Sequence, residues 1–379
     1  MPNFGNLRIY LVLPIFFIMF ACSSPAPKAI IETQDIETAV ISWATGFDIS
    51  DYGEVKVLRF FQKGDTSRVD SLVLYKVPSR IPFRFNCRSV KYPVNSAACL
   101  SATHVSFIHK IGMLDKVTGI TALDHSFLPE LESSVKSGKV KEIAVGGNFK
   151  SETLLALNPD VVFISPMKNQ SLELLEKSGL LLVPVGEFLE TSPLGRAEWI
   201  KYVSLFFDAA DKAAQVFDSL EMKYLHLKSL TLKIPAENKP AVFSGNLISG
   251  VWYLPGGNSY ESAFFKDAGA RYLWEDNPEP GSIGLGYESV FVRAVKADYW
   301  RMVVYTDQDY TYEKMKLEDE RYTNFPAFSR RKVFCCNTRH SPLYQVGVLE
   351  PHVILADYIF IFHPDLLPGY SPVYYHLLK

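Results

Sequence analysis

The side chains best suited to hold a small molecule follow strand-like segments of this 379-residue chain. They are polar or aromatic and form two sets. The first set comprises Ser101, Thr103, His104, Ser165 and Met167. The second set comprises Trp252, Tyr253, Tyr305, Arg339 and His340, with Thr306 and Asn337 beside them. Aromatic rings suit a flat or hydrophobic ligand, arginine and histidine can meet carboxylates, and histidine can also bind a metal.

A glycine-rich turn at 255–259 precedes a predicted helix. Gly257 lies within the sequence Pro-Gly-Gly-Asn-Ser, in which Asn258 or Ser259 can cap that helix. Backbone N–H groups at such a helix start can receive an anionic group, so Gly257 is a candidate ligand contact. A turn that only caps the helix explains the same residues equally well.

Sequence motifs of common enzymes are absent from the chain. It contains no GxSxG, HExxH, GxxxxGK[ST] or GxGxxG pattern, and its eight histidines are scattered. The cysteines show no CxxC pair and no zinc-type spacing. We therefore predict a binding protein that is not an enzyme and has no cofactor or structural metal. A cell-envelope hydrolase is a less favoured alternative, because a catalytic triad assembled by the fold is invisible in sequence.

From Tyr92 onward, strands alternate with helices, which predicts parallel sheets with crossover helices. The first series of predicted strands covers 97–101, 117–121, 161–165 and 180–185. The second series covers 240–244, 300–306 and 332–336. Between them, a helix over 209–232 carries an apolar stripe of Ala213, Val216, Phe217, Leu220, Tyr224 and Leu227.

These elements predict an α/β fold with two Rossmann-like lobes, 92–192 and 234–379. Linker helices over 193–233 join the lobes, and the long helix would extend about 35 Å, enough to brace both. A β-rich extension over 38–91 comes before the lobes. Because open α/β sheets bind ligands at the carboxyl ends of their strands, the candidate residues should line a cleft between the lobes.

The N-terminus predicts export and lipid attachment. Residues 10–21 are apolar but too few to span a bilayer, which needs about 20 such residues, so 1–21 reads as a signal peptide. Met19-Phe20-Ala21-Cys22 is similar to a bacterial lipobox, and the Ser/Pro-rich stretch over 22–37 reads as a tether. We expect a periplasmic or cell-surface protein anchored to a bacterial membrane through Cys22. An ordinary cleaved signal with an incidental cysteine is the alternative.

Composition excludes some partners. The net charge of −2 gives no electrostatic basis for binding nucleic acid, and no later segment is predicted to span a membrane. The remaining cysteines are Cys87, Cys99, Cys335 and Cys336. Neighbouring cysteines rarely bond each other, so we expect buried thiols, with Cys87–Cys99 the one disulfide worth testing.

Several stretches resemble the class III (cluster A) substrate-binding lipoproteins of bacterial ABC importers. The most specific is ETLLALNPDVVFIS at 152–165, and others are SATHVSFIHKIG, PLGRAEWIKY and GVWYLPGGNSYESAFFKDAGARYLW. The resemblance covers most of the chain from Tyr92. It implies a monomer that delivers a ferric siderophore, haem or cobalamin to a permease–ATPase complex. A lipoprotein that binds a free metal ion, and one that binds a chelate without an importer, remain alternatives.

The resemblance also implies two docking residues. In this family each lobe presents a surface glutamate to arginines of the permease, and the matching positions are Glu152 and Glu288. Both glutamates begin predicted helices. An acid there is also favoured by the helix dipole, so each residue could simply stabilise its own helix.

Overall fold

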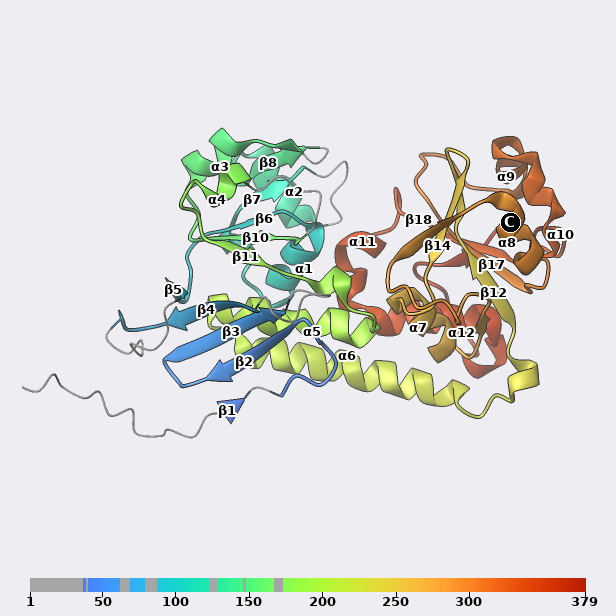
Figure 1. Cartoon of the computed structure of the whole chain (residues 1–379), viewed down its shortest axis with the longest axis horizontal. Helices are drawn as coiled ribbons and strands as arrows, with labels where there is room; N and C mark the ends of the chain where they lie inside the picture. Colours follow the sequence, from blue (N-terminus) through green and yellow to red (C-terminus); the bar gives the residue numbers. More distant parts are fainter. Residues whose placement is uncertain are drawn as a thin grey trace, which may run out of the picture. The chain divides into compact units, whose positions relative to one another are not determined.

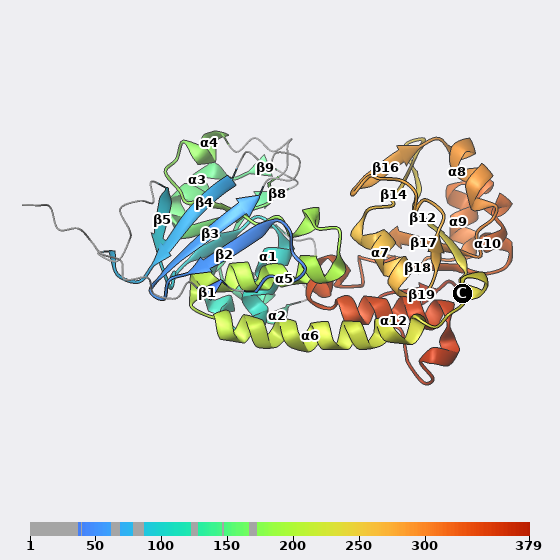
Figure 2. The same cartoon turned by 60° about the horizontal axis from the view of Figure 1, so that its bottom comes forward.

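The computed structural model describes residues 37–38, 40–61, 69–78, 87–122, 128–145, 148–166 and 173–379. The predicted signal peptide, Cys22, residues 22–36 of the predicted tether and the ligand candidate Met167 lie outside the described residues. Residues 36–379 form one unit, in which two α/β lobes lie along a long helix (Figures 1 and 2).

The N-lobe is built on a six-stranded sheet with the order β11-β10-β6-β7-β8-β9. Its strands are β6 (Ala97–Cys99), β7 (Val117–Thr121), β8 (Lys141–Val145), β9 (Asn148–Phe149), β10 (Val161–Ile164) and β11 (Leu182–Pro184). Only β9 runs antiparallel to its neighbour. Its helices are α1 (Ala102–Lys110), α2 (Pro129–Lys136), α3 (Ser151–Leu157) and α4 (Glu173–Glu176).

Alternation along the strands gives the N-lobe sheet two apolar faces. Ala97 and Cys99 face the cluster that includes α1 and α2, whereas Ala98 faces the cluster that includes α3 and α4. Because both faces are covered, the strands are continuously apolar, as in other buried parallel sheets. α3 ends at Asn158, whose φ of 41° is left-handed, and Pro159 prevents its continuation.

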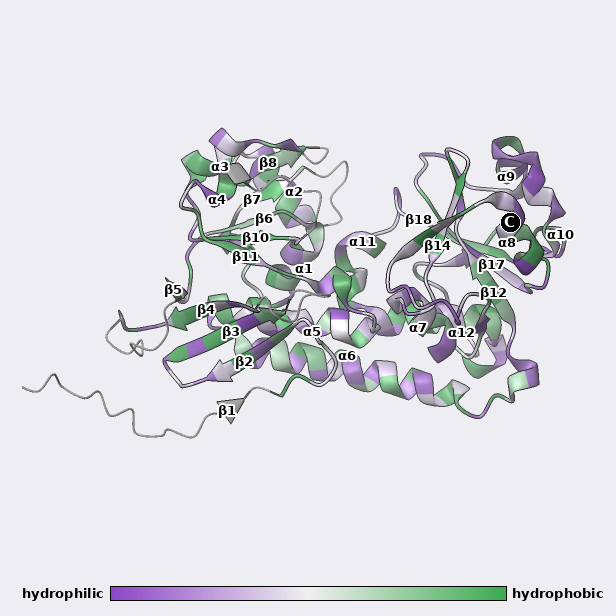
Figure 3. Cartoon of the chain, viewed as in Figure 1, coloured by the Kyte–Doolittle hydropathy of each residue, from purple (hydrophilic) through white to green (hydrophobic). Residues whose placement is uncertain are grey.

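Two linker helices join the lobes. α5 (Pro193–Ser204) continues into a 3-10 turn, and α6 (Ala210–Thr231) has 22 residues, about 33 Å. α6 packs against α5 and against α12 (Pro351–Phe362) of the C-lobe. Its buried face comprises Ala213, Phe217, Leu220, Tyr224 and Thr231. Hydrophobic and hydrophilic residues alternate along α6 in Figure 3, as expected for an amphipathic helix.

The C-lobe contains a five-stranded sheet with the order β15-β12-β17-β18-β19 and a small sheet β13-β14-β16. The larger sheet comprises β12 (Ala241–Ser244), β15 (Arg271–Tyr272), β17 (Tyr299–Val304), β18 (Val333–Asn337) and β19 (His376–Leu377). The small sheet comprises β13 (Asn246–Ile248), β14 (Val251–Pro255) and β16 (Ser282–Leu285). Its helices, besides α12, are α7 (Tyr260–Asp267), α8 (Tyr287–Ala294), α9 (Tyr312–Glu318), α10 (Pro326–Ser329) and α11 (Leu343–Val346).

The N-terminal extension is a five-stranded sheet with the order β1-β2-β3-β4-β5. Its strands are β1 (Glu37–Thr38), β2 (Phe47–Asp51), β3 (Val55–Phe61), β4 (Val69–Tyr75) and β5 (Arg88–Lys91). One face of this sheet packs on α5, where the rings of Phe47 and Trp199 lie 4.7 Å apart. The extension therefore shares the hydrophobic core of the N-lobe.

Two buried carboxylates fasten the segment 42–46 of the extension to the N-lobe, and we call them the carboxylate clamp. Glu198 accepts hydrogen bonds from the backbone N–H groups of 42–44 at 2.8–3.0 Å. Glu190 accepts from the N–H groups of Thr45 and Gly46 at 2.9 Å. Gly195 permits this approach, because a Cβ there would lie 2.9 Å from the carbonyl oxygen of Trp43.

The two α/β lobes, the long helix and the β-rich extension agree with the predicted fold class. All four described cysteines are free thiols, so the Cys87–Cys99 disulfide is not formed. Burial raises the pKa of the Cys335 thiol to about 12. Within the described ranges, no single helix has the length and hydropathy of a membrane span; the bent pair 343–349 and 351–362 meets those criteria only when combined.

Candidate functional site

A cleft lies between the lobes and consists of two cavities. The smaller cavity, about 50 Å³, is lined by Thr103, Pro193 and Arg196 on the N-lobe side. The larger, about 280 Å³, includes Phe188 from that side and Tyr253 from the small sheet of the C-lobe. Four C-lobe residues line both cavities: Tyr260, Glu261, Arg301 and Tyr344. We call these two cavities together the inter-lobe cleft.

A hollow of about 660 Å³ continues the cleft along the carboxyl ends of the C-lobe strands. Tyr344 and Asn246 line both this C-lobe groove and the cleft. Tyr305 and Thr306, which follow β17, also line the groove. The volumes of the groove and the larger cavity are of the order found in small-molecule sites, roughly 300–1,000 Å³.

An ion pair buried in the C-lobe forms part of the cleft wall. Arg301 lies on β17, and its Nη2 is 2.8 Å from Oε1 of Glu261, which lies in the first turn of α7. Arg301 also donates to the hydroxyl groups of Tyr358 and Tyr375, and Tyr358 donates to Glu261 at 2.6 Å. Burial alone would lower the pKa of Arg301, but Glu261 and the tyrosines hold it well above its ordinary value. The guanidinium therefore stays charged.

Arg196 supplies a second cation on the opposite wall. It lies on α5, and its guanidinium carbon is 4.0 Å from the ring centre of Tyr260 across the cleft. Its Nε is buried without a hydrogen-bond partner in the part of the chain that the structure describes. No described acid forms an ion pair with Arg196, so its charge is available to an acidic group in the cleft.

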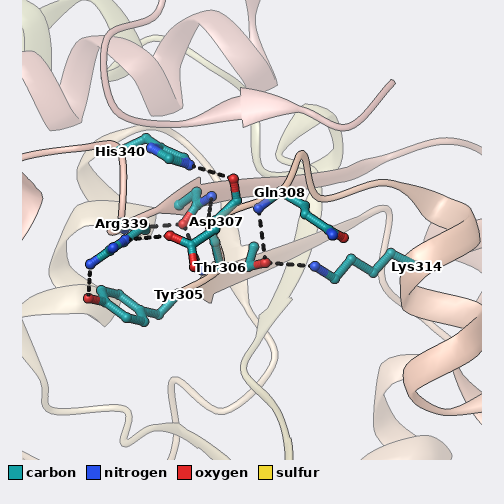
Figure 4. A network of polar contacts seen from close by, with 8 residues as sticks. Tyr305, Thr306, Asp307, Gln308, Lys314, Arg339 and His340 are labelled. Carbon is teal, nitrogen blue, oxygen red and sulfur yellow. Dashed lines mark hydrogen bonds and ion pairs between the residues drawn. The ribbon is translucent and has the colours of Figure 1, made fainter.

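Arg339 and His340 take part in a polar network at the carboxyl ends of β17 and β18 (Figure 4). Arg339 donates to Asp307 at 2.7 Å and to the Tyr305 hydroxyl at 2.9 Å, and these bonds raise its pKa. The Nε2 atom of His340 lies 3.2 Å from the backbone oxygen of Asp307. An acidic ligand group would have to compete with Asp307 for Arg339.

On the N-lobe side, the predicted residues surround the start of α1. Ser101 caps this helix, and Thr103 donates its hydroxyl proton to Glu187 at 2.5 Å. His104 is completely buried, with Nε2 3.8 Å from Glu187, and burial lowers its pKa in spite of that carboxylate. Ser165 is buried beyond β10. Thr103 is the predicted N-lobe residue that reaches the cleft.

Two C-lobe predictions and His104 are contradicted by their surroundings. Trp252 is fully buried, stacks among Phe243, Trp300 and Phe325, and donates its indole N–H to Ser244. Gly257 is pressed against a turn, since a Cβ there would lie 2.3 Å from the carbonyl oxygen of Trp274. Neither residue lines the cleft. His104 is likewise fully buried and does not line the cleft.

Tyr253 does line the cleft and is 45% exposed. It is the neighbour of Trp252 on β14, and side chains alternate between the two faces of a strand. Tyr305 is 57% exposed along the C-lobe groove. The sequence therefore identified segments that line the cavities, but it could not assign the face on which each aromatic side chain lies.

Several cleft residues were missed by the sequence interpretation. They are Phe188, Arg196, Tyr260, Glu261, Arg301 and Tyr344. Arg301 left a readable signal, because it stands alone as a charge in the apolar strand YWRMVV. Arg196 left none, because the resemblance had assigned its helix only to the linker.

Glu152 and Glu288 are both exposed in first turns, of α3 and α8 respectively. Each belongs to a different lobe, as the docking interpretation requires. The described residues contain no group of three or more His, Cys, Asp or Glu side chains that could hold a metal ion.

Comparison with known proteins identifies the architecture. A family model described as "Periplasmic binding protein" matches residues 98–339, which include cleft-lining residues from both lobes. The chain belongs to the periplasmic binding protein family. The family resemblance drawn from the residues is thereby confirmed.

An uncharacterized lipoprotein of Methanocaldococcus jannaschii is similar to this periplasmic binding protein, with 25% identity over 295 residues. That alignment covers 75% of this chain and 69% of the lipoprotein. A periplasmic binding protein from Veillonella parvula has a TM-score of 0.60 at 14% identity, covering 81% of this chain and 98% of that chain. A periplasmic heme binding protein from Pseudomonas aeruginosa has a TM-score of 0.57 at 14% identity, with coverages of 74% and 96%. These structural similarities establish the fold.

Proposed function

We propose that this protein captures a metal chelate in the inter-lobe cleft and delivers it to an ABC permease. The observation that carries the proposal is Arg196, a cation without an acidic partner among the described residues, which faces an aromatic wall across the cleft. A ferric siderophore, haem or cobalamin presents polar or acidic edges on a large, partly hydrophobic body. Arg196 suits the acidic edge, and Tyr253, Tyr260 and Tyr344 suit the body.

Family membership and the neighbouring structures support this ligand class. One structural neighbour is named as a heme-binding protein, which is consistent with an iron chelate as the ligand here. The volumes of the larger cleft cavity and the C-lobe groove also favour a ligand larger than a single ion.

The ligand can be identified by purification from native cells, followed by an absorption spectrum and mass analysis. We expect a coloured chelate that co-purifies in a fixed ratio to protein. Titration of ligand-free protein with haemin, a ferric siderophore and cyanocobalamin then ranks the three classes. If none of the three binds and no chelate co-purifies, the proposed function is wrong.

Arg196→Gln tests the residue on which the proposal depends. We expect about tenfold weaker chelate binding, because one charge-assisted hydrogen bond is lost. Arg330→Gln is the matched control, since Arg330 is largely exposed and does not line the cleft. Equal affinities for both variants would contradict an acidic contact at Arg196.

We further propose that Cys22 carries the lipid and keeps the carrier on the outer side of a cytoplasmic or outer membrane. The lipobox-like sequence supports this, as does the lipoprotein name of the Methanocaldococcus relative. Mass spectrometry of the mature chain should find diacylglycerol on Cys22 as the first residue. An unmodified N-terminus elsewhere would contradict the anchor.

A further inference from the structure

A second hollow lies away from the cleft, where α1, α6 and the beginning of α12 meet. Its volume is about 420 Å³, and none of its lining residues belongs to the cleft or the C-lobe groove. α1 belongs to the N-lobe, α12 belongs to the C-lobe, and α6 links them. We call this hollow the junction pocket.

The junction pocket is lined by three lysines: Lys110 on α1, and Lys212 and Lys223 on α6. None of the three lysine side chains forms an ion pair or hydrogen bond within the described part of the chain. Glu350 is the one acid among the lining residues, and its carboxylate accepts a hydrogen bond from Tyr374. Three lysines and one glutamate leave two positive charges here, although the whole chain carries −2.

His352 gives an independent sign of an incomplete polar site. It lines the pocket, and its Nδ1 is buried without a hydrogen-bond partner among the described residues. Burial lowers the pKa of His352, and Lys223 and Lys110 lower it further, whereas Glu350 raises it. Burial and the two lysines therefore both disfavour the protonated imidazole.

The floor and rim of the pocket add neutral groups. Gln215 and Ser219 lie one turn apart on α6 and can donate hydrogen bonds to an oxyanion. Leu220 and Leu349 are buried at the floor. A ligand that matches all these groups carries about two negative charges, several acceptor oxygens and some apolar substituent.

We propose that the junction pocket binds a phosphate group, most simply a phosphate monoester. A phosphate monoester carries about −1.5 to −2 charges at neutral pH, which matches the two positive charges of the pocket. Lysines bind phosphate as point charges, and the pocket has room beyond the phosphate for the esterified group. Because both lobes contribute residues, a bound phosphate also links the lobes on the side of α6.

Calorimetry with inorganic phosphate and with glycerol 3-phosphate tests the site. The full chain is used with Cys22→Ala, so that no variant carries a lipid on residue 22. We expect Lys212→Gln combined with Lys223→Gln to weaken binding about 100-fold, since two charge-assisted contacts are lost. Lys233→Gln is the control, because Lys233 is exposed beyond the end of α6 and does not line the pocket.

Vesicles separate a dissolved phosphate from a lipid headgroup. Co-flotation is measured with phosphatidic acid–phosphatidylcholine vesicles, in which phosphatidic acid presents a phosphate monoester, and with phosphatidylcholine vesicles alone. Dissolved ligands that bind, with loss only in the double lysine variant, support the site and a soluble source. Binding only to phosphatidic acid vesicles, with the same dependence on the lysines, supports the site and a lipid source. No binding to any probe overturns the proposal, as does an equal loss in the Lys233→Gln control.

His352 provides a readout that a purely structural role would not move. In NMR titrations, sulfate, whose charge is constant near neutral pH, should raise the pKa of His352 by offsetting the two nearby lysines. The double lysine variant should show a higher His352 pKa without sulfate and a smaller response to it. An unchanged His352 pKa at saturating sulfate would overturn the proposed site.

Discussion

The two lobes share a parallel sheet but use their additional strands differently. The C-lobe adds the small sheet β13-β14-β16, which turns Tyr253 toward the cleft and buries Trp252 behind it. The N-lobe adds the sheet β1–β5, which packs behind α5, away from the residues that line the cleft. The two similar sheets thus have different roles. The C-lobe supplies most of the cleft surface, and the N-lobe packs against the N-terminal extension.

Permease docking is the one role for which the lobes should be equivalent. Reversing both charges, with Glu152→Lys and Glu288→Lys, should abolish chelate uptake by cells. The introduced lysines would repel the arginines that the permease is expected to present. Chelate affinity of the purified variant should stay unchanged. Each single variant tests one lobe. Normal uptake by the double variant would leave the two glutamates as helix-stabilising residues only.

The buried Arg301–Glu261 ion pair belongs to the C-lobe, and breaking it should lower the free energy of unfolding. Glu261→Leu should cost about 3–5 kcal/mol of unfolding free energy, because Arg301 is left charged and buried without its partner. Combining it with Arg301→Met should recover much of that loss. Urea unfolding followed by fluorescence measures both. A double variant as unstable as Glu261→Leu would point to lost packing instead of an unpaired charge.

The carboxylate clamp distinguishes the N-lobe. Glu198→Gln should cost about 1.5–3 kcal/mol, because three backbone N–H groups and Lys201 lose a charged acceptor. Glu237→Gln, at an exposed position outside the clamp, is the control. Limited proteolysis near 40–46 should accelerate only in the clamp variant. Equal stability of the two variants would mean that the clamp does not hold the extension.

A smaller, pH-dependent effect is expected from His104. Its pKa is lowered in the folded protein, so the unfolded chain takes up a proton first as the pH falls below about 6.5. The contribution of His104 to the free energy of unfolding should therefore be constant above that pH. Below it, the free energy of unfolding should decrease by at most about 1.4 kcal/mol per pH unit. Unfolding from pH 7.5 to 5 should show a shallower decline for His104→Asn. His352→Gln checks the contribution of His352, whose pKa is also lowered in the folded protein.

Regular periodicity made much of the fold predictable. The strand expected at 117–121 coincides with β7, and α6 differs from its predicted bounds by one residue at each end. The small C-lobe sheet was missed, because β13 and β14 are short and rich in glycine neighbours. Short elements of this kind depend on tertiary packing more than on local pattern.

The cleft was less predictable than the fold. Of the residues nominated by the carboxyl-end rule, Thr103 and Tyr253 line the cleft and Tyr305 lines the C-lobe groove. It could not find Arg196, because that residue lies on a linker helix and reaches the cleft only through the packing of α5 against α7. It also nominated His104, which is fully buried beside Glu187, a residue 83 positions later in the chain.

The packing of α6 against both α5 and α12 has a kinetic consequence for the proposed carrier. A helix of 22 residues held by both lobes sets the cleft before the chelate arrives, so little conformational entropy is lost on binding. Association is then limited by diffusion and orientation, and differences in affinity between chelates reside mainly in their dissociation rates. Release at the membrane consequently requires the proposed permease to accelerate dissociation of the chelate, which is slow from the isolated protein.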